Sequence, residues 1–162
     1  MKQLKPNREF VLRHLFVALL MLGMSGWFAY DGWVKYPSMS QDALYEMVEK
    51  QPAPNSEAAA KVAANAIHRQ KEFTCLALLA SLVIGAHLAA VMRQRFEYSD
   101  DGFAVDGAKY SFNDIAQVDD GAWQKKGIVR LILKNTRRVT LDAWHHSGVK
   151  EFHEILERTL KS

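Results

Sequence analysis

Two long stretches without a charged residue dominate the hydrophobic pattern of the chain. Residues 15–30 and 73–92 contain no Asp, Glu, Lys or Arg. A helix of about 20 residues rises about 30 Å, which is the thickness of the hydrocarbon core of a bilayer. The second stretch has this length, and the first reaches it when it continues to Val34. The pattern therefore predicts two transmembrane helices, at about 14–34 and 73–92.

Two other interpretations of these stretches compete with membrane spans. Lys2, Lys5 and Arg8 ahead of a short apolar core are typical of a signal peptide, but the residues after that core include the bulky Trp27 and Phe28, whereas cleavage requires small residues. Both stretches could instead be buried helices of a soluble protein. The rest of so short a chain could hardly cover two helices that are apolar on all sides. A two-span membrane protein is favoured.

The distribution of basic residues predicts the orientation of the spans. The connecting segment 31–72 has five Lys or Arg in forty-two residues, two of which, Arg69 and Lys71, lie close to the second span. Short basic segments stay on the cytoplasmic side. Both termini are therefore expected in the cytoplasm, with the protein in the cytoplasmic (inner) membrane. The basic residues that flank the spans on that side are Lys2, Lys5, Arg8, Arg13, Arg93 and Arg95.

The segment between the spans has helical character. Ser40 precedes a short amphipathic pattern that ends at Lys50, and prolines at 52 and 54 break it. A helix is expected from about 56 to 95, so that residues 1–95 form a transmembrane hairpin with a helical extracytoplasmic loop at 35–72. Small residues recur every four positions in the second span and allow close packing on the first span or on another copy. These candidate packing residues are Ala77, Ser81, Gly85 and Ala89.

After Arg95 the pattern changes to short strands separated by turn residues. Val129, Leu131 and Leu133 alternate with Arg130 and Lys134, which predicts a sheet with one face in a core. An amphipathic helix is expected at 147–160. The fold class is α+β, with residues 96–162 forming a small bent antiparallel sheet or partial barrel capped by the final helix. The expected strands are 96–99, 103–105, 108–111, 115–118, 128–133 and 138–141.

Segments 110–118 (YSFNDIAQV), 123–128 (WQKKGI) and 139–144 (VTLDAW), followed by the final helix, resemble the bacterial pleckstrin-homology-like (PH-like) domains. In many membrane proteins these domains follow a pair of spans. The resemblance implies a bent antiparallel barrel capped by a helix, and a domain that binds proteins or lipids or acts as a scaffold without a reaction. Phosphoinositide-binding members carry basic residues in the first hairpin. This chain departs from them, because its first hairpin carries Glu97, Asp100, Asp101 and Asp106.

The basic residues of the domain are balanced by acidic ones. Residues 96–162 contain ten Lys or Arg and eleven Asp or Glu, which argues against nucleic acid as a partner. Solvated strand faces are the simplest interpretation, and contact with anionic headgroups of the bilayer is the alternative. Trp123 and Trp144 either fill the core or anchor a protein partner or a second copy. The candidate partner-binding residues are Trp123, Trp144, Lys125, Lys126, Arg137 and Arg138.

The histidines give no recognisable plan for catalysis. His145 and His146 are adjacent and would point to opposite faces of a strand, and no repeated Cys/His spacing indicates zinc. No phosphate-binding loop or hydrolase motif is present in the sequence. Surface histidines are expected, with no catalytic residue, cofactor or metal. A small enzyme that uses Asp142, His145, His146 and His153 is the least favoured alternative.

These observations predict a non-enzymatic, membrane-anchored adaptor or scaffold. A PH-like domain at the inner face of the membrane would bind a protein partner or its own copy. The alternative is an accessory subunit of a larger membrane complex, which would contact its partners through the outer helical hairpin.

Overall fold

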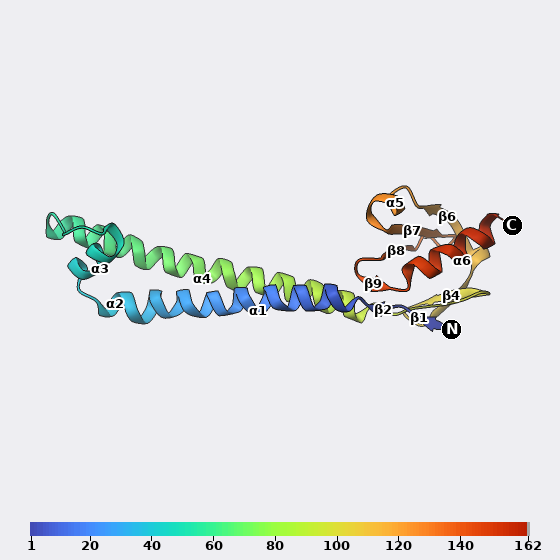
Figure 1. Ribbon diagram of the computed structural model, residues 1–162, viewed down its shortest axis with the longest axis horizontal. Helices are drawn as coiled ribbons and strands as arrows, with labels where there is room; N and C mark the ends of the chain where they lie inside the picture. Colours follow the sequence, from blue (N-terminus) through green and yellow to red (C-terminus); the bar gives the residue numbers. More distant parts are fainter. Residues whose placement is uncertain (162) are drawn as a thin grey trace. The chain divides into compact units, whose positions relative to one another are not determined.

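The structure, a computed structural model, describes residues 1–161 and is of the α+β class (Figure 1). Its contacts divide the chain into two compact units. One unit contains Met1–Arg13 together with His87–Ser162, and the other contains His14–Ala86. The domain boundary predicted from the sequence lies after Arg95, with residues 1–13 and 87–95 in the hairpin. The structure instead packs these two segments with the small α+β domain.

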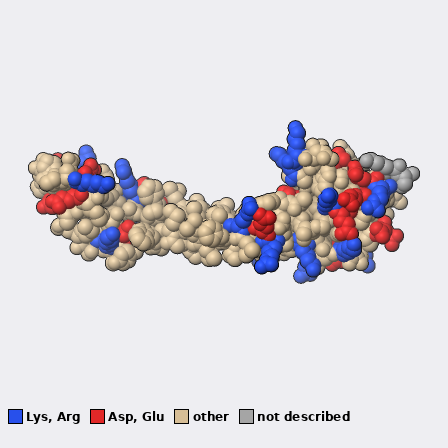
Figure 2. Space-filling view, viewed as in Figure 1, with Lys and Arg blue, Asp and Glu red and all other residues tan. Residues whose placement is uncertain are grey.

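Two long helices pass the length and hydropathy criteria for membrane spans. Helix α1 (Arg8–Tyr30) continues through a π-helical turn (Asp31–Lys35) and a short helix α2 (Tyr36–Ser38), and α4 runs over Ser56–Arg93. Only 17% of the most apolar window of each helix is buried. Figure 2 shows the middle of these helices without charged side chains on the visible face. The amino-acid pattern therefore leaves apolar side chains on the outside of both helices.

Polar residues at the helix termini fix the segment between the two long helices. Ser40 caps α3 (Gln41–Glu49), since its Oγ accepts a hydrogen bond of 3.3 Å from the backbone N–H of Ala43. Lys50 ends α3 in the left-handed conformation. Asn55 Oδ1 accepts a hydrogen bond of 2.8 Å from the N–H of Ala58 at the start of α4. The predicted short helix and the predicted long helix are both present.

Small and hydroxylated side chains bring α1 and α4 together within the unit His14–Ala86. Ser81 Oγ donates a hydrogen bond of 2.9 Å to the carbonyl of Ala18, and Ser25 Oγ donates one of 3.1 Å to the carbonyl of Thr74. Of the predicted packing residues in this unit, Ala77 is buried and Ser81 is half-buried. Gly85 has open space where a Cβ would lie. Ala77 and Ser81 therefore lie in the closely packed part of the helix pair. Ala89, which belongs to the other unit, is exposed, so the prediction that all four residues form a packing surface is wrong for Ala89.

The other unit is built from antiparallel strands closed by one helix. A four-stranded sheet has the order β1-β3-β4-β5, a three-stranded sheet has the order β6-β7-β8, and β2 pairs with β9. A turn of helix, α5 (Trp123–Lys126), connects β6 to β7, and α6 (Val149–Lys161) ends the chain. The strands are β1 (Lys2–Gln3), β2 (Lys5–Pro6), β3 (Phe96–Ser99), β4 (Gly102–Val105), β5 (Ala108–Ser111), β6 (Ile115–Asp119), β7 (Ile128–Leu133), β8 (Arg138–Asp142) and β9 (His146–Ser147).

The core of this unit follows the predicted alternation along β7 and β8. Val129 and Leu131 on β7 are fully buried, while Arg130 between them is exposed. Phe152 on α6 is also fully buried and meets the ring of Phe96 edge-on, with 4.9 Å between the centroids. Helix α6 therefore covers the apolar side of the strands, as the amphipathic pattern predicted.

The N-terminal residues complete this core. Leu4, between β1 and β2, is only 2% exposed and belongs to the same cluster as Phe96 and Phe152. Its backbone N–H donates a hydrogen bond of 2.9 Å to the carbonyl of Phe96. On either side of Leu4, Lys2 pairs with Tyr98 and Pro6 with His146 in antiparallel register. These strands have two residues each and were not anticipated.

Candidate functional site

An aromatic cluster lies where the first turns of α1 pack on the small domain. Phe10 is buried, and its ring packs near three other rings. The distance between ring centroids is 4.6 Å to His145, 6.0 Å to His87 and 6.4 Å to Trp144. The guanidinium of Arg13 lies 5.4 Å from the ring centroid of Trp144. Trp144 itself is 41% exposed. The cluster thus presents one large aromatic side chain and one cation to the outside.

The histidines of this region are more buried than predicted. His146 on β9 is 5% exposed and His153 on α6 is 4% exposed, so the expectation of surface histidines is wrong for both. The Nε2–H of His146 donates a hydrogen bond of 3.4 Å to the carbonyl of Val91. Burial lowers the pKa of His146, because it disfavours the charged imidazolium, and the neighbouring His145 also lowers it. His145 is half-buried, with Nδ1 3.7 Å from a carboxylate oxygen of Asp142.

Trp123 faces the interior more than Trp144 does. It is partly buried, packs against the main core cluster and stacks on the ring of His153, with 4.1 Å between centroids and 15° between planes. The helical turn that carries it ends at Gly127, whose φ of 65° is a left-handed conformation. The two candidate tryptophans therefore occupy different environments, one against the core and one exposed.

The four candidate basic residues do not share one environment either. Lys125 and Lys126 are exposed on α5, and Arg138 is exposed on β8. Arg137 donates a hydrogen bond of 2.6 Å to Asp106 and one of 3.4 Å to the hydroxyl of Tyr110. The hydrogen bond to Tyr110, followed by the Asp106 carboxylate, raises the pKa of Arg137. Arg137 thus has a structural role that joins two turns, while the two lysines and Arg138 offer their charge to the solvent.

A second polar cluster attaches the N-terminal strand to α6. Lys2 forms an ion pair with Glu151, and the hydroxyl of Tyr98 donates a hydrogen bond of 2.8 Å to the other carboxylate oxygen of Glu151. The hydrogen bonds from Lys2 and Tyr98 lower the pKa of Glu151. Burial, and then the bond to Glu151, raises the pKa of Tyr98 to about 12. No sequence pattern indicated this cluster, because its members lie far apart along the chain.

The unit His14–Ala86 contains a cavity of about 310 Å³ between α3, α4 and α2. Tyr36, Val48, Ala66 and Gln70 are among the residues that line it. The Oε1 atom of Gln70 is buried and accepts no hydrogen bond from the described residues, while its Nε2 donates a 3.4 Å hydrogen bond to the hydroxyl of Tyr36. Glu49, Asn65 and Arg69 also line the cavity, so its wall combines apolar side chains with polar and charged ones.

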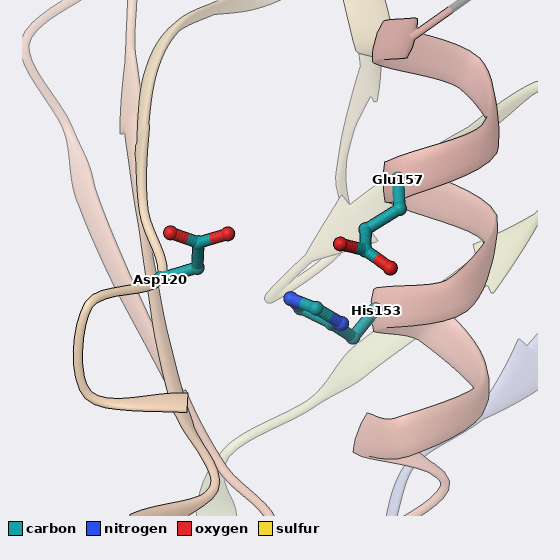
Figure 3. A group of neighbouring side chains, drawn as sticks. All are labelled: Asp120, His153 and Glu157. Atoms are coloured by element: carbon teal, nitrogen blue, oxygen red, sulfur yellow. The ribbon is translucent and has the colours of Figure 1, made fainter. Parts of the chain in front are cut away.

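The structure regroups the residues of the enzyme alternative. His145 and Asp142 lie near each other, and the rings of His145 and His146 are 6.5 Å apart. His153 instead lies with Asp120 and Glu157 (Figure 3).

Neither the protein-family models nor the curated proteins match this sequence, and no solved structure matches its fold.

Proposed function

We propose that the chain is a two-span protein of the cytoplasmic membrane and that its small domain is a non-enzymatic binding module held at the inner face. The module would act as an adaptor for a protein partner or for a second copy of the chain. The observation that carries this proposal is the position of Leu4 in the core of the domain that residues 96–161 form.

Leu4 bears on the topology because it joins the segment that precedes the long helices in sequence to the domain that follows them. The strands at 2–6 pair with β3 and β9, so the N-terminal segment and the domain fold on the same side of any membrane. The chain leaves this unit after Arg13 and returns at His87. An even number of membrane crossings fits this path, and two apolar helices of sufficient length lie in between, which supports the proposal of two spans.

The same observation weighs against the two competing interpretations of the apolar helices. A cleaved signal peptide would remove Leu4 from the core and two strands from the sheets. Core helices of a soluble protein would be mostly buried, whereas 17% of the most apolar windows of α1 and α4 is buried. Leu19, Phe16 and Leu82 are among the apolar side chains more than half exposed on these helices. Lipid is the solvent that tolerates such a surface.

The charges of the two units support a cytoplasmic domain. The unit with both termini contains sixteen Lys or Arg and twelve Asp or Glu, while residues 14–86 contain five and six. Arg13 and Arg93 lie close to the ends of the apolar stretches on the more basic side. Positively charged flanks stay on the cytoplasmic side of the membrane.

Trp144 and Arg13 are suited to the headgroup region. Tryptophan concentrates at membrane interfaces because its ring is apolar and its N–H is polar, and arginine is attracted to anionic lipids. Trp144 is exposed and lies against Arg13 at the start of the first apolar helix. This arrangement would keep one edge of the domain at the inner leaflet and leave Lys125, Lys126 and Arg138 available to a partner.

The resemblance to PH-like domains also favours an adaptor. Antiparallel strands closed by a C-terminal helix are the architecture that the resemblance implies, and such domains bind proteins or lipids rather than catalyse reactions. The acidic residues of the β3–β4 hairpin, Asp100 and Asp101, are exposed, which disfavours phosphoinositide binding through that hairpin.

Topology reporters test the membrane part of the proposal. Reporters fused at Met1 and at Ser162 should both be active only in the cytoplasm, and a reporter inserted at Pro52 should be active only outside. Reporters on opposite sides at the two termini, or a chain that stays soluble without detergent, would overturn the proposal.

Purification in mild detergent tests the adaptor part of the proposal. The full chain should retain a protein partner or self-associate, and Lys125→Glu with Lys126→Glu should weaken that association, whereas Lys61→Glu should not.

The cavity in the unit His14–Ala86 favours a second candidate, an accessory subunit that contacts a larger complex through its outer hairpin. Its wall carries Glu49, Asn65, Arg69 and Gln70, which could form polar contacts with another protein. Replacement of residues 40–55 by a flexible linker should abolish association if this candidate is correct and should leave it intact if the small domain is the contact.

A further inference from the structure

We infer that Asp120, His153 and Glu157 form a binding site for a divalent first-row transition metal ion such as Zn²⁺. The site would connect the β6–α5 loop to α6 within the small domain.

The three side chains converge from two elements. Asp120 lies in the loop after β6, and His153 and Glu157 lie one helical turn apart on α6, so that both face the same side of the helix. One ring nitrogen of His153 and one carboxylate oxygen from each acid all lie within 4.8 Å of one another. Figure 3 shows the imidazole extending from α6 toward Asp120, with the Glu157 carboxylate on the same side. Ligand atoms bound to one Zn²⁺ at about 2.0–2.2 Å are at most about 4.4 Å apart, so the three groups need only a small side-chain adjustment to bind one ion.

The imidazole of His153 supplies an independent sign of a ligand. Its side chain is 96% buried, since the residue is only 4% exposed, and its Nε2 has no hydrogen-bond partner among the described residues. Buried polar atoms without a partner are rare because the unmade hydrogen bond costs free energy. If Nε2 is the nitrogen that binds the ion, the metal would use its lone pair and remove this cost. An imidazole that served only to fill the core would need no carboxylates beside it.

The donor atoms select the class of ion. Mg²⁺ and Ca²⁺ prefer all-oxygen ligand sets, whereas a nitrogen with two carboxylate oxygens suits Zn²⁺ and its neighbours in the first row. Three protein ligands leave a coordination position for water. Asp120 is exposed and Glu157 is half-buried, which gives the ion a path from the solvent.

Trp123 supports the site from its other side. Its ring stacks on His153 with 15° between the planes and holds the imidazole in its present orientation. Groups that orient a ligand without touching the metal contribute measurably to affinity. Because Trp123 also begins α5, a bound ion would fix the helical turn that carries Lys125 and Lys126. Metal occupancy would thus order the surface to which the proposed partner binds.

Titration of the full chain in detergent with Zn²⁺ alone tests the inference. Isothermal titration calorimetry should show one site. Asp120→Asn and Glu157→Gln should each weaken binding by more than the roughly tenfold to hundredfold loss that follows removal of an outer-sphere group. The matched controls are Asp101→Asn and Glu154→Gln, which change the same residue types on the exposed surface and should bind as the wild type does. Co²⁺ should quench Trp123 fluorescence in the wild type and not in Asp120→Asn.

Asp120→Asn and Glu157→Gln keep the test independent of folding, since neither substitution alters the buried His153. Absence of Zn²⁺ binding by the wild type would overturn the inference. So would equal affinities in the wild type and both site variants, or binding that His145→Ala abolishes while Asp120→Asn retains it. The adaptor proposal would survive each of these outcomes, because it rests on Leu4 and on the two apolar helices.

Discussion

The backbone N–H of Leu4 donates a hydrogen bond to the carbonyl oxygen of Phe96, 2.9 Å away, and so joins the segment before the first long helix to the strand after the second. The Leu4 side chain lies in the same core cluster as Phe96. Residues 96–161 thus form only part of the folded unit. The N-terminal segment contributes two strands and a core residue to a domain whose other strands follow the second helix.

Leu4→Ala should destabilise this domain. Truncation of a buried Leu costs about 2–5 kcal/mol, because transfer free energy is lost and a cavity remains. The free energy of unfolding of the full chain, measured in detergent with denaturant, should fall by that amount. Leu12→Ala is the matched control, since Leu12 is 52% exposed and its truncation should leave the unfolding free energy unchanged in detergent. Equal effects of the two substitutions would show that Leu4 does not belong to the core.

The strands and helices with a sequence period of their own were predictable. Val129, Leu131 and Leu133 are apolar at every second position of β7, with Arg130 between the first two, and α6 has an apolar stripe, so both elements are visible in isolation. The strands β1, β2 and β9 have two residues each, which is too short for any period. They form because Leu4 and His146 are buried by residues distant in sequence, and such contacts leave no local pattern.

The candidate site was predictable only in part. Trp144 and the exposed lysines could be chosen by residue type, because large aromatics and cations dominate interfaces. The burial of His146 and His153 could not, since each depends on residues from another element that cover it. In the sequence-based enzyme alternative His153 belongs to one group with Asp142, whereas the fold brings it to Asp120 and Glu157. Spacing along the chain does not reveal a cluster formed by a loop and a helix from different parts of the sequence.

Replacement of each tryptophan by alanine should separate a core role from a surface role. Trp123 packs on the core and on His153, so Trp123→Ala should lower the unfolding free energy by up to about 3–5 kcal/mol. Trp144 is 41% exposed, so Trp144→Ala should cost markedly less stability. It should instead weaken the association of the domain with anionic vesicles, measured by Trp fluorescence or by co-sedimentation. Greater destabilisation by Trp144→Ala than by Trp123→Ala would contradict these assignments.

Ala77→Leu should disrupt the pairing of α1 and α4. Ala77 is 8% exposed where the helices approach, and extra methylene groups in a packed interface cost about 1–3 kcal/mol. Thermal unfolding of the full chain in detergent should shift to a lower temperature. Cys75→Leu on the same helix is the control, because Cys75 is exposed and a larger apolar side chain there meets only lipid or detergent. A tolerated Leu at 77 would mean that these helices do not pack through this surface.

Gly102→Ala should disrupt the pairing of β4 with β5. A Cβ at Gly102 would lie 2.4 Å from the carbonyl oxygen of Tyr110, which is backbone and cannot move without breaking the strand register. Gly26→Ala is the matched control, because no atom lies within 4 Å of its Cβ position. Hydrogen exchange of the amides of β4 and β5 should accelerate in Gly102→Ala and not in Gly26→Ala. Unchanged protection in both variants would contradict the close approach.

The burial of His146 should make the stability of the small domain depend on pH. Burial lowers the pKa of His146 in the folded chain below the ordinary value of 6.5, which applies to the unfolded chain. Below pH 6.5 the unfolded chain therefore binds more protons at this position, and the unfolding free energy falls as the pH falls. The hydrogen bond to the carbonyl of Val91 and, less strongly, Asp142 oppose this lowering of the pKa, and His145 reinforces it; the direction follows the largest cause, which is burial.

His146→Gln isolates this contribution, because glutamine cannot titrate and retains an N–H donor for the carbonyl of Val91. Between about pH 7.5 and about pH 5.5, denaturant unfolding of the wild type in detergent should show a larger loss of stability than unfolding of this variant. His68→Gln, at an exposed position outside the domain, should follow the wild-type curve. Parallel pH curves for the wild type and His146→Gln would show that His146 is not held neutral by the fold. If the wild type instead gains stability on acidification relative to His146→Gln, the pKa of His146 is raised by folding. The domain would then stabilise the imidazolium and not the neutral ring.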